Sequence, residues 1–195
     1  MKKLYYILFL LSIHIGLVSA QWSISPEFGI SAFQHTGLFD GWRPAVKAGA
    51  AVEYALKPNF SIESGLFYTQ RGYSLAGYVD NDEWPITSIE RPSLVRHMFQ
   101  IPVMARFSWE IADDVRFFAG AGPYIGFFFA NDWKQTYQYR NADYGNVFDW
   151  GFTFMAGIEV KRLYFRLAYD VALGGEPGGV HANYHVGSLT VGYKF

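Results

Sequence analysis

Apolar and polar residues alternate with a period of two along most of this 195-residue chain. From Trp22 to Phe195, eight stretches place Phe, Ile, Leu, Val and Trp in one phase and charged or small residues in the other. A period of two is typical of β-strands, whose successive side chains point to opposite faces. Strands with one apolar and one charged face suit a barrel that is apolar outside and polar inside. A lipid bilayer favours that arrangement, because a closed barrel pairs its own backbone polar groups.

The pattern predicts an all-β protein, an eight-stranded antiparallel up-and-down transmembrane β-barrel. The predicted strands are 22–34, 43–56, 60–71, 96–109, 115–130, 148–161, 163–173 and 184–195. Long links alternate with short ones, which is typical of bacterial outer-membrane barrels with short periplasmic turns, long external loops and both termini in the periplasm. Pro102 lies inside the fourth predicted strand without an N–H to donate, so we expect a bulge or a local break there.

The first twenty residues do not follow the alternation. Lys2 and Lys3 give a positive start, residues 4–17 are mostly apolar, and small residues precede a cleavage point after Ala20. This is the pattern of a secretory signal peptide. We therefore expect residues 1–20 to be removed and residues 21–195 to form the outer-membrane barrel domain. An uncleaved anchor is the alternative, but the apolar run is short for a helical span.

Charge and composition exclude several classes of protein. Loss of the two lysines takes the formal net charge from -1 to -3, and the chain has no nucleotide-binding motif, so we expect no nucleic-acid partner. The absence of cysteine excludes a lipoprotein anchor, a thiol nucleophile and disulfides. Aromatic residues make up 19% of the chain although its mean hydropathy is near zero, as expected when only half of a barrel faces lipid. A soluble ligand-carrying barrel would need the aromatic phase inside, and the alternating link lengths give it no support.

Charged residues fall in the inward phase. Eight strands enclose a lumen just wide enough for side chains to fill, and buried charges have to be paired. We therefore expect a closed lumen with ion pairs, and the alternative is a narrow polar channel. Inward glycines of the fifth strand are expected to leave room for large neighbours. The expected inward charges are Glu27, Arg43, Lys47, Glu53, Glu63, Arg71, Arg96, Arg106, Arg116, Asp149, Glu159, Arg166, Asp170 and Lys194.

Two long links carry aromatic residues that suit binding. Tyr78 and Trp84 lie in the link 72–95, and a second set lies in the link 131–147, namely Trp133, Tyr137 and Tyr139. Aromatic side chains next to Asn, Asp and Gln bind sugars or protein surfaces, and they can equally pack on one another as a lid. We expect a structural or surface-interaction protein, with a surface protein or a glycan as the partner of the external loops.

A lipid-modifying enzyme, such as a lipid A hydrolase, is a further alternative. It would need a nucleophile and a base near the external rim, and His181 and His185 lie near Ser188, with Asp170 on the neighbouring strand. In the predicted register, however, His185 points outward and Ser188 inward, unless a one-residue bulge reverses them. A metal site at the two histidines lacks a third ligand. We expect no enzymatic activity, no cofactor and no metal.

Three motifs in the chain resemble those of a known protein family. They are Gln100-Ile101-Pro102-Val103, the run AGAGPYIG at 119–126, and the terminal Val191-Gly192-Tyr193-Lys194-Phe195. They resemble the small outer-membrane β-barrel proteins of the PorT-like, or outer membrane protein beta-barrel domain, type that is common in Bacteroidota. The resemblance covers the mature chain and implies the outer membrane of a Gram-negative cell. Members are mostly of unknown function and one branch takes part in secretion, so a secretion-accessory barrel remains an alternative. Phe195 also resembles the C-terminal aromatic signal that the barrel assembly machinery reads.

Overall fold

The computed structural model describes residues 21–35, 42–74, 93–134, 148–174 and 184–195. In these ranges the strands close into one antiparallel barrel in which each strand pairs with its neighbours in the chain and β1 pairs with β8. The predicted fold class is confirmed. The strands are β1 Trp22–His35, β2 Arg43–Lys57, β3 Phe60–Ser74, β4 Ser93–Ala112, β5 Val115–Lys134, β6 Phe148–Val160, β7 Leu163–Ala172 and β8 Tyr184–Tyr193. The predicted signal peptide lies outside the described residues.

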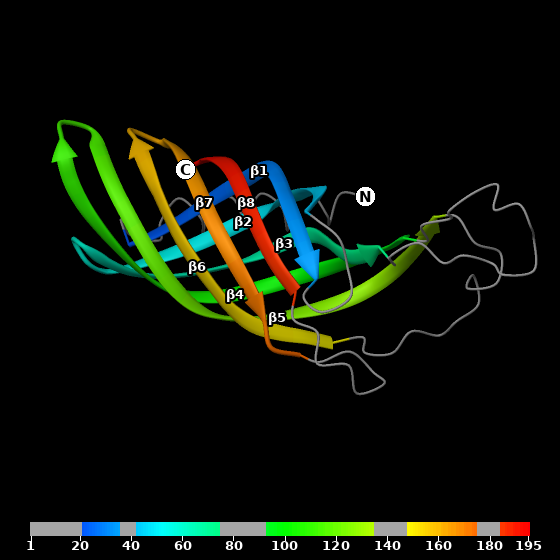
Figure 1. The fold of residues 1–195 in the computed structure, drawn as a ribbon. Coiled ribbons are helices and arrows are strands. Elements are labelled where there is room, and N and C mark those ends of the chain that lie inside the picture. Colours follow the sequence, from blue (N-terminus) through cyan, green and yellow to red (C-terminus); the bar gives the residue numbers. More distant parts are fainter. Residues whose placement is uncertain (1–20, 36–41, 75–92, 135–147, 175–183) are drawn as a thin grey trace, which may run out of the picture.

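The connections define two ends of the barrel (Figure 1). At one end, which we call the turn end, strands are joined by the two-residue turns 58–59, 113–114 and 161–162. At the opposite end, which we call the loop end, the strands are joined by 36–42, 75–92, 135–147 and 173–183. No described segment is a helix long and apolar enough to cross a membrane.

Side-chain burial alternates along most of the strands, as the sequence pattern predicts. In β6, Phe148, Trp150 and Phe152 are exposed on the outer surface, whereas Asp149 and Thr153 are buried in the lumen. The outer surface is therefore largely apolar all round the barrel. Ring pairs gather on it at the turn end, namely Trp22–Tyr54, Trp109–Phe117 and Tyr193–Phe195. Aromatic residues favour the interface between bilayer and water, so this belt fits the edge of a membrane span.

Of the bulge or local break predicted at Pro102, the structure shows the break. β4 keeps one register with both neighbours across this proline, and the shift between β4 and β5 nearest to it falls between His97 and Met98. A local break does occur, because no residues pair between Ser64 and Phe67 of β3 and the facing part of β4. The Ser64 hydroxyl donates to the Pro102 carbonyl at 2.8 Å. The pairing of β4 with β5 also has a gap here, at Val103 and Met104, and neither gap shifts the register of the strand.

Three strands, β3, β4 and β5, extend at least three residues further toward the loop end than the pattern predicts, and β3 ends at Ser74. β4 and β5 have 20 residues each, and they pair as far as Ser93 with Lys134. Parts of the predicted links 72–95 and 131–147 are therefore strand, and Trp133 lies on β5. Figure 1 shows β4 and β5 running past the rest of the barrel. A strand outside the membrane needs no apolar outer phase, so alternation gives no signal for it.

The predicted turn 110–114 is shorter in the structure. β4 continues to Ala112, and Asp113 and Asp114 alone make the turn. Asp114 has a φ of 61°, in the left-handed region that Asp tolerates better than most residues.

Candidate functional site in the lumen

Charged side chains fill the lumen. Glu53 and Lys194 are partly buried there. Arg43, at the loop end of β2, and Arg116, at the turn end of β5, are half-buried. The predicted inward charges that are buried are Glu27, Lys47, Glu63, Arg71, Arg96, Arg106, Asp149, Glu159, Arg166 and Asp170. Their contacts form two groups along the barrel axis.

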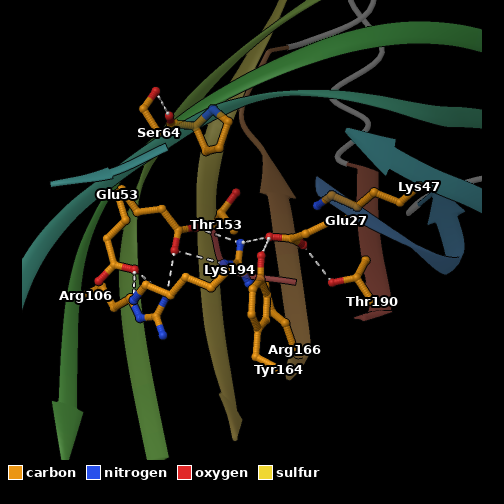
Figure 2. Close-up of polar contacts among 12 residues, drawn as sticks. Glu27, Lys47, Glu53, Ser64, Arg106, Thr153, Tyr164, Arg166, Thr190 and Lys194 are labelled. Carbon is orange, nitrogen blue, oxygen red and sulfur yellow. Dashed lines mark hydrogen bonds and ion pairs between the residues drawn. The ribbon is translucent and has the colours of Figure 1, made fainter. Parts of the chain in front are cut away.

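The first group, which we call the turn-side cluster, is centred on Arg106 of β4. Its guanidinium lies 3.1 Å from the Glu53 carboxylate of β2, 3.2 Å from Glu63 of β3 and 2.8 Å from Glu159 of β6. Lys194 reaches Glu53 at 2.8 Å and Glu159 at 3.7 Å. Figure 2 shows Arg106 and Lys194 on either side of Glu53. One guanidinium thereby joins four strands, which its planar fork of donors permits.

Glu27 of β1 also belongs to the turn-side cluster. It accepts hydrogen bonds from the Tyr164 hydroxyl of β7 at 2.6 Å and from the Thr190 hydroxyl of β8 at 2.9 Å (Figure 2). Arg166 lies 3.1 Å from Glu27 and 2.7 Å from Glu63. Side chains therefore tie β1 to both β7 and β8, and backbone pairing also joins it to β8.

The second group, which we call the loop-side cluster, surrounds Arg71 of β3. This side chain is fully buried; it forms an ion pair with Asp149 of β6 and donates to the Tyr124 hydroxyl at 2.8 Å. Asp170 of β7 lies 3.8 Å from both Arg71 and Lys47. The two carboxylates here are thus matched by two cations, as buried charges require.

Neutral donors complete the loop-side cluster. Asp170 accepts hydrogen bonds from the Thr153 hydroxyl at 2.7 Å and from the Gln100 amide at 3.2 Å. Closer to the loop end than this cluster, the Arg96 guanidinium lies 3.7 Å from the centre of the Phe128 ring. At this distance a cation and an aromatic ring attract each other. Arg116, in contrast, lies at the turn end and donates to the Pro58 carbonyl.

A cavity of about 10 Å³ remains between the two clusters. That volume holds roughly one water molecule. Its walls come from both clusters and include Glu27, Lys47, Gln100, Thr153, Arg166 and Thr190. The space is thus on the scale of a bound water rather than of an ion pathway.

Large lumen side chains lie opposite glycines. A Cβ added at Gly157 would lie 2.4 Å from the Phe118 ring, and one at Gly192 would lie 2.3 Å from the Tyr164 ring. Such contacts are far inside van der Waals range. The cross-strand pairs of this kind are Gly49 with Phe67, Gly151 with Tyr124, Gly157 with Phe118 and Gly192 with Tyr164. The small inward residues therefore admit the rings that help to fill the lumen.

Tyr164, Thr190 and the inward phenylalanines are parts of the lumen that sequence reasoning missed. Tyr164 and Thr190 occupy the inward phase, but the pattern of one strand does not reveal that both reach Glu27. To see that they do, one must know how β1 pairs with β8 where the barrel closes, and how β8 pairs with β7. A glycine directly opposite each ring is the signal that could have revealed the aromatic filling, once the pairing of the strands was known.

The residues of the enzyme alternative do not come together. His185 faces outward, where its Nδ1 lies 2.8 Å from the Tyr169 hydroxyl, whereas Ser188 is buried in the lumen. β8 keeps one register with β7 and with β1, so no bulge brings His185 to the side of Ser188. His181 lies outside the described residues. Within the described ranges, no three His, Asp or Glu side chains form a group that could hold a metal ion.

Most of the predicted loop-binding residues cannot be placed. Trp133 lies on β5 in register with Leu94 of β4. The other four, which are Tyr78, Trp84, Tyr137 and Tyr139, lie outside the described residues.

Comparison with known proteins gives one family and several similar structures. Residues 10–176 match the family model described as outer membrane protein beta-barrel domain. No curated protein matches the sequence. The outer membrane protein OprG from Pseudomonas aeruginosa is similar with a TM-score of 0.58 and 12% identity, over 90% of this chain and 96% of that chain. Neisserial surface protein A is similar with a TM-score of 0.52 and 10% identity, over 89% and 97%. Likeness at such low identity concerns the fold alone.

Proposed function

The chain belongs to the outer membrane protein beta-barrel domain family, and from this premise we propose that it is a closed structural or surface-interaction barrel rather than a channel. Residues 1–20 direct its export, the barrel assembly machinery inserts it, and the turn end and both termini lie in the periplasm. The loop end then faces outward and presents the long connections to a surface protein or a glycan. The sequence motifs noted above favour the PorT-like branch of Bacteroidota.

The observation that carries this proposal is the pairing of charges across the lumen. Arg106 and Arg166 reach carboxylates on β1, β2, β3 and β6, and Arg71 reaches from β3 to Asp149 on β6. Each such contact crosses the space that a pore would need. The cavity left between the clusters is about 10 Å³. Ions would have to break several buried ion pairs to pass, each of which costs several kcal/mol to separate.

Planar-bilayer recording tests the closed lumen. The mature protein, purified and refolded in detergent, is expected to give no conductance steps at neutral pH in concentrated salt, with a known porin as the positive control. Reproducible single-channel steps from correctly folded protein would contradict the proposal and favour the narrow channel.

The orientation is tested with cysteine labelling, because the natural chain has no cysteine to interfere. Asn59→Cys lies in an exposed turn at the turn end, and Asp82→Cys lies in the longest connection at the loop end. A membrane-impermeant maleimide on intact cells is expected to label Asp82→Cys and to label Asn59→Cys only after the cells are opened. The reverse result would place the loop end in the periplasm and contradict the surface-interaction function.

The surface role is tested on the loops themselves. Fluorescently labelled protein on an array of bacterial and host glycans, and on immobilised surface proteins, is expected to bind a defined set of targets. Trp84→Ala and Tyr137→Ala are expected to weaken that binding, whereas Trp22→Ala, a change of similar size at the turn end, is expected to leave it unchanged. Binding that is indifferent to the loop changes would contradict the assigned role.

A further inference from the structure

The outer surface carries the same small arrangement twice at the loop end. The Tyr68 hydroxyl of β3 lies 2.6 Å from His97 Nδ1 of β4, and the Tyr169 hydroxyl of β7 lies 2.8 Å from His185 Nδ1 of β8. The ring centres are 5.9 Å and 5.8 Å apart. The two strand pairs lie on opposite sides of the barrel, because two strands separate them in each direction round the closed order.

Each pair lies on the outward phase, between the apolar belt and the loop end. Tyr169 pairs with Gly187, and His185 pairs with Val171. One step nearer the turn end, the facing residues are Leu167 and Leu189, both exposed on the apolar surface. The Tyr–His pairs therefore continue the bilayer-facing surface at the level where hydrocarbon gives way to lipid headgroups.

An exposed aromatic ring flanks each pair. Phe129 is 55% exposed and its ring centre lies 6.1 Å from that of His97. Trp42 is 50% exposed, and a Cβ built on Gly187 would lie 3.9 Å from the Trp42 ring. We call these groups the rim patches: one is Tyr68, His97, Phe99 and Phe129, and the other is Trp42, Tyr169, His185 and Gly187.

The turn end differs in its chemistry. One of its outward tyrosines, Tyr54, donates to the Gln21 side chain at 2.9 Å rather than to a histidine. Every histidine in the described residues lies in the loop-end half of its strand, at positions 35, 97 and 185. The two rims of the barrel are thus built for different surroundings, as the two leaflets of an asymmetric membrane would require.

A Tyr–His pair suits an anionic oxygen. When Nδ1 accepts the hydrogen bond from the tyrosine hydroxyl, the neutral imidazole carries its proton on Nε2 and is a donor there. A protonated imidazole gives the stronger, charge-assisted hydrogen bond to phosphate. An exposed aromatic ring beside it provides an apolar face for a sugar ring. Phosphate next to sugar is the headgroup chemistry of a phosphorylated glycolipid.

We propose that the two rim patches bind the phosphorylated glucosamine headgroup of lipid A in the outer leaflet. The proposal rests on the orientation argued above, in which the loop end faces outward. Each patch holds one headgroup, with His97 or His185 donating to the phosphate and Phe129 or Trp42 lying against the sugar.

Native mass spectrometry of the barrel in detergent micelles tests the proposal. The probes are bisphosphorylated lipid A, its monophosphoryl form and phosphatidylglycerol. Up to two molecules of bisphosphorylated lipid A are expected to bind. The double variant His97→Phe/His185→Phe, which keeps a ring at each position, is expected to bind roughly tenfold more weakly, as loss of one charge-assisted hydrogen bond predicts. Tyr68→Phe/Tyr169→Phe is expected to weaken binding in the same direction.

Matched controls locate the site and check the fold. Tyr54→Phe removes the same hydroxyl at the turn end and is expected to leave lipid A binding unchanged. Retention of the heat-sensitive gel mobility shows that each variant still folds. Equal binding of phosphatidylglycerol, or a Tyr54→Phe effect as large as that of Tyr169→Phe, would overturn the proposal. Because micelles have no leaflets, a reversed orientation in the cysteine experiment would contradict the proposed function without deciding this binding result.

Discussion

Replacement of Arg106 by Met is expected to cause a large loss of stability. Met keeps a long apolar stem beside the Phe118 ring, which lies 3.9 Å from the Arg106 guanidinium carbon, but it removes the charge. Glu63 then keeps Arg166 as its partner. Glu159 keeps only Lys194 at 3.7 Å. The change therefore leaves buried carboxylate charge without enough cations nearby.

The magnitude follows from the burial of the cluster. Removal of one partner from a buried ion pair costs roughly 3–5 kcal/mol. Because the carboxylates around Arg106 keep other cations, we expect the cost of one pair rather than of three. With an unfolding slope of about 2 kcal/mol per molar urea, the midpoint of unfolding falls by about 2 M. Arg116→Met is the matched control. Arg116 is half-buried, and among the described residues it donates to the Pro58 carbonyl alone, so its loss costs at most about 1 kcal/mol.

Reversible urea unfolding in lipid vesicles, followed by tryptophan fluorescence and by heat-sensitive gel mobility, measures both variants. Arg106→Lys adds a graded test, because one ammonium cannot span three carboxylates, and it should fall between wild type and Arg106→Met. Equal midpoints for Arg106→Met and Arg116→Met would show that the turn-side cluster does not depend on Arg106.

Two further substitutions test the packing of the lumen and the face that meets lipid. Gly157→Ala is expected to cost roughly 1–3 kcal/mol in the same urea assay, because its methyl group overlaps both the Phe165 carbonyl oxygen and the Phe118 ring. Gly187→Ala, with 3.9 Å of space, should be close to neutral, and similar midpoints would contradict the close packing. Leu167→Arg, at a mid-strand position that is 63% exposed, is expected to cost about 2–4 kcal/mol in vesicles, and Leu163→Arg, beside the turn 161–162, about 0–1 kcal/mol; a Leu167→Arg protein as stable as wild type would mean that this face does not meet hydrocarbon.

The alternation of residues was sufficient to predict the fold because the bilayer makes the two faces of each strand so different. A lipid-facing position tolerates few polar residues and a lumen position tolerates charge, so every membrane-spanning strand carries the signal. The signal ends where the membrane ends, which is why β3, β4 and β5 are longer than predicted. At Pro102 the predicted break occurs without a bulge, because a local gap in the ladder costs less than a shift of the whole strand.

The identity of the inward charges also follows from the phase of the pattern, but their partners do not. Arg106 and Glu159 are separated by one strand in the barrel, and nothing in either local sequence indicates that they meet. The pairing depends on the stagger between strands and on side-chain length. Arg116 shows the limit of the phase argument, because it shares the inward phase yet lies at the turn end beside a backbone carbonyl rather than in the ion-pair network.

Glu27 has a consequence for how the protein is made. Its partners Tyr164, Arg166 and Thr190 come from the last two strands, more than 130 residues later in the chain for Tyr164. A chain shortened before β7 therefore carries Glu27 with none of the three, and its open sheet would turn charged residues toward hydrocarbon. Such a fragment cannot rest stably in the bilayer. We therefore expect completion of the whole chain to be a condition for stable insertion into the membrane.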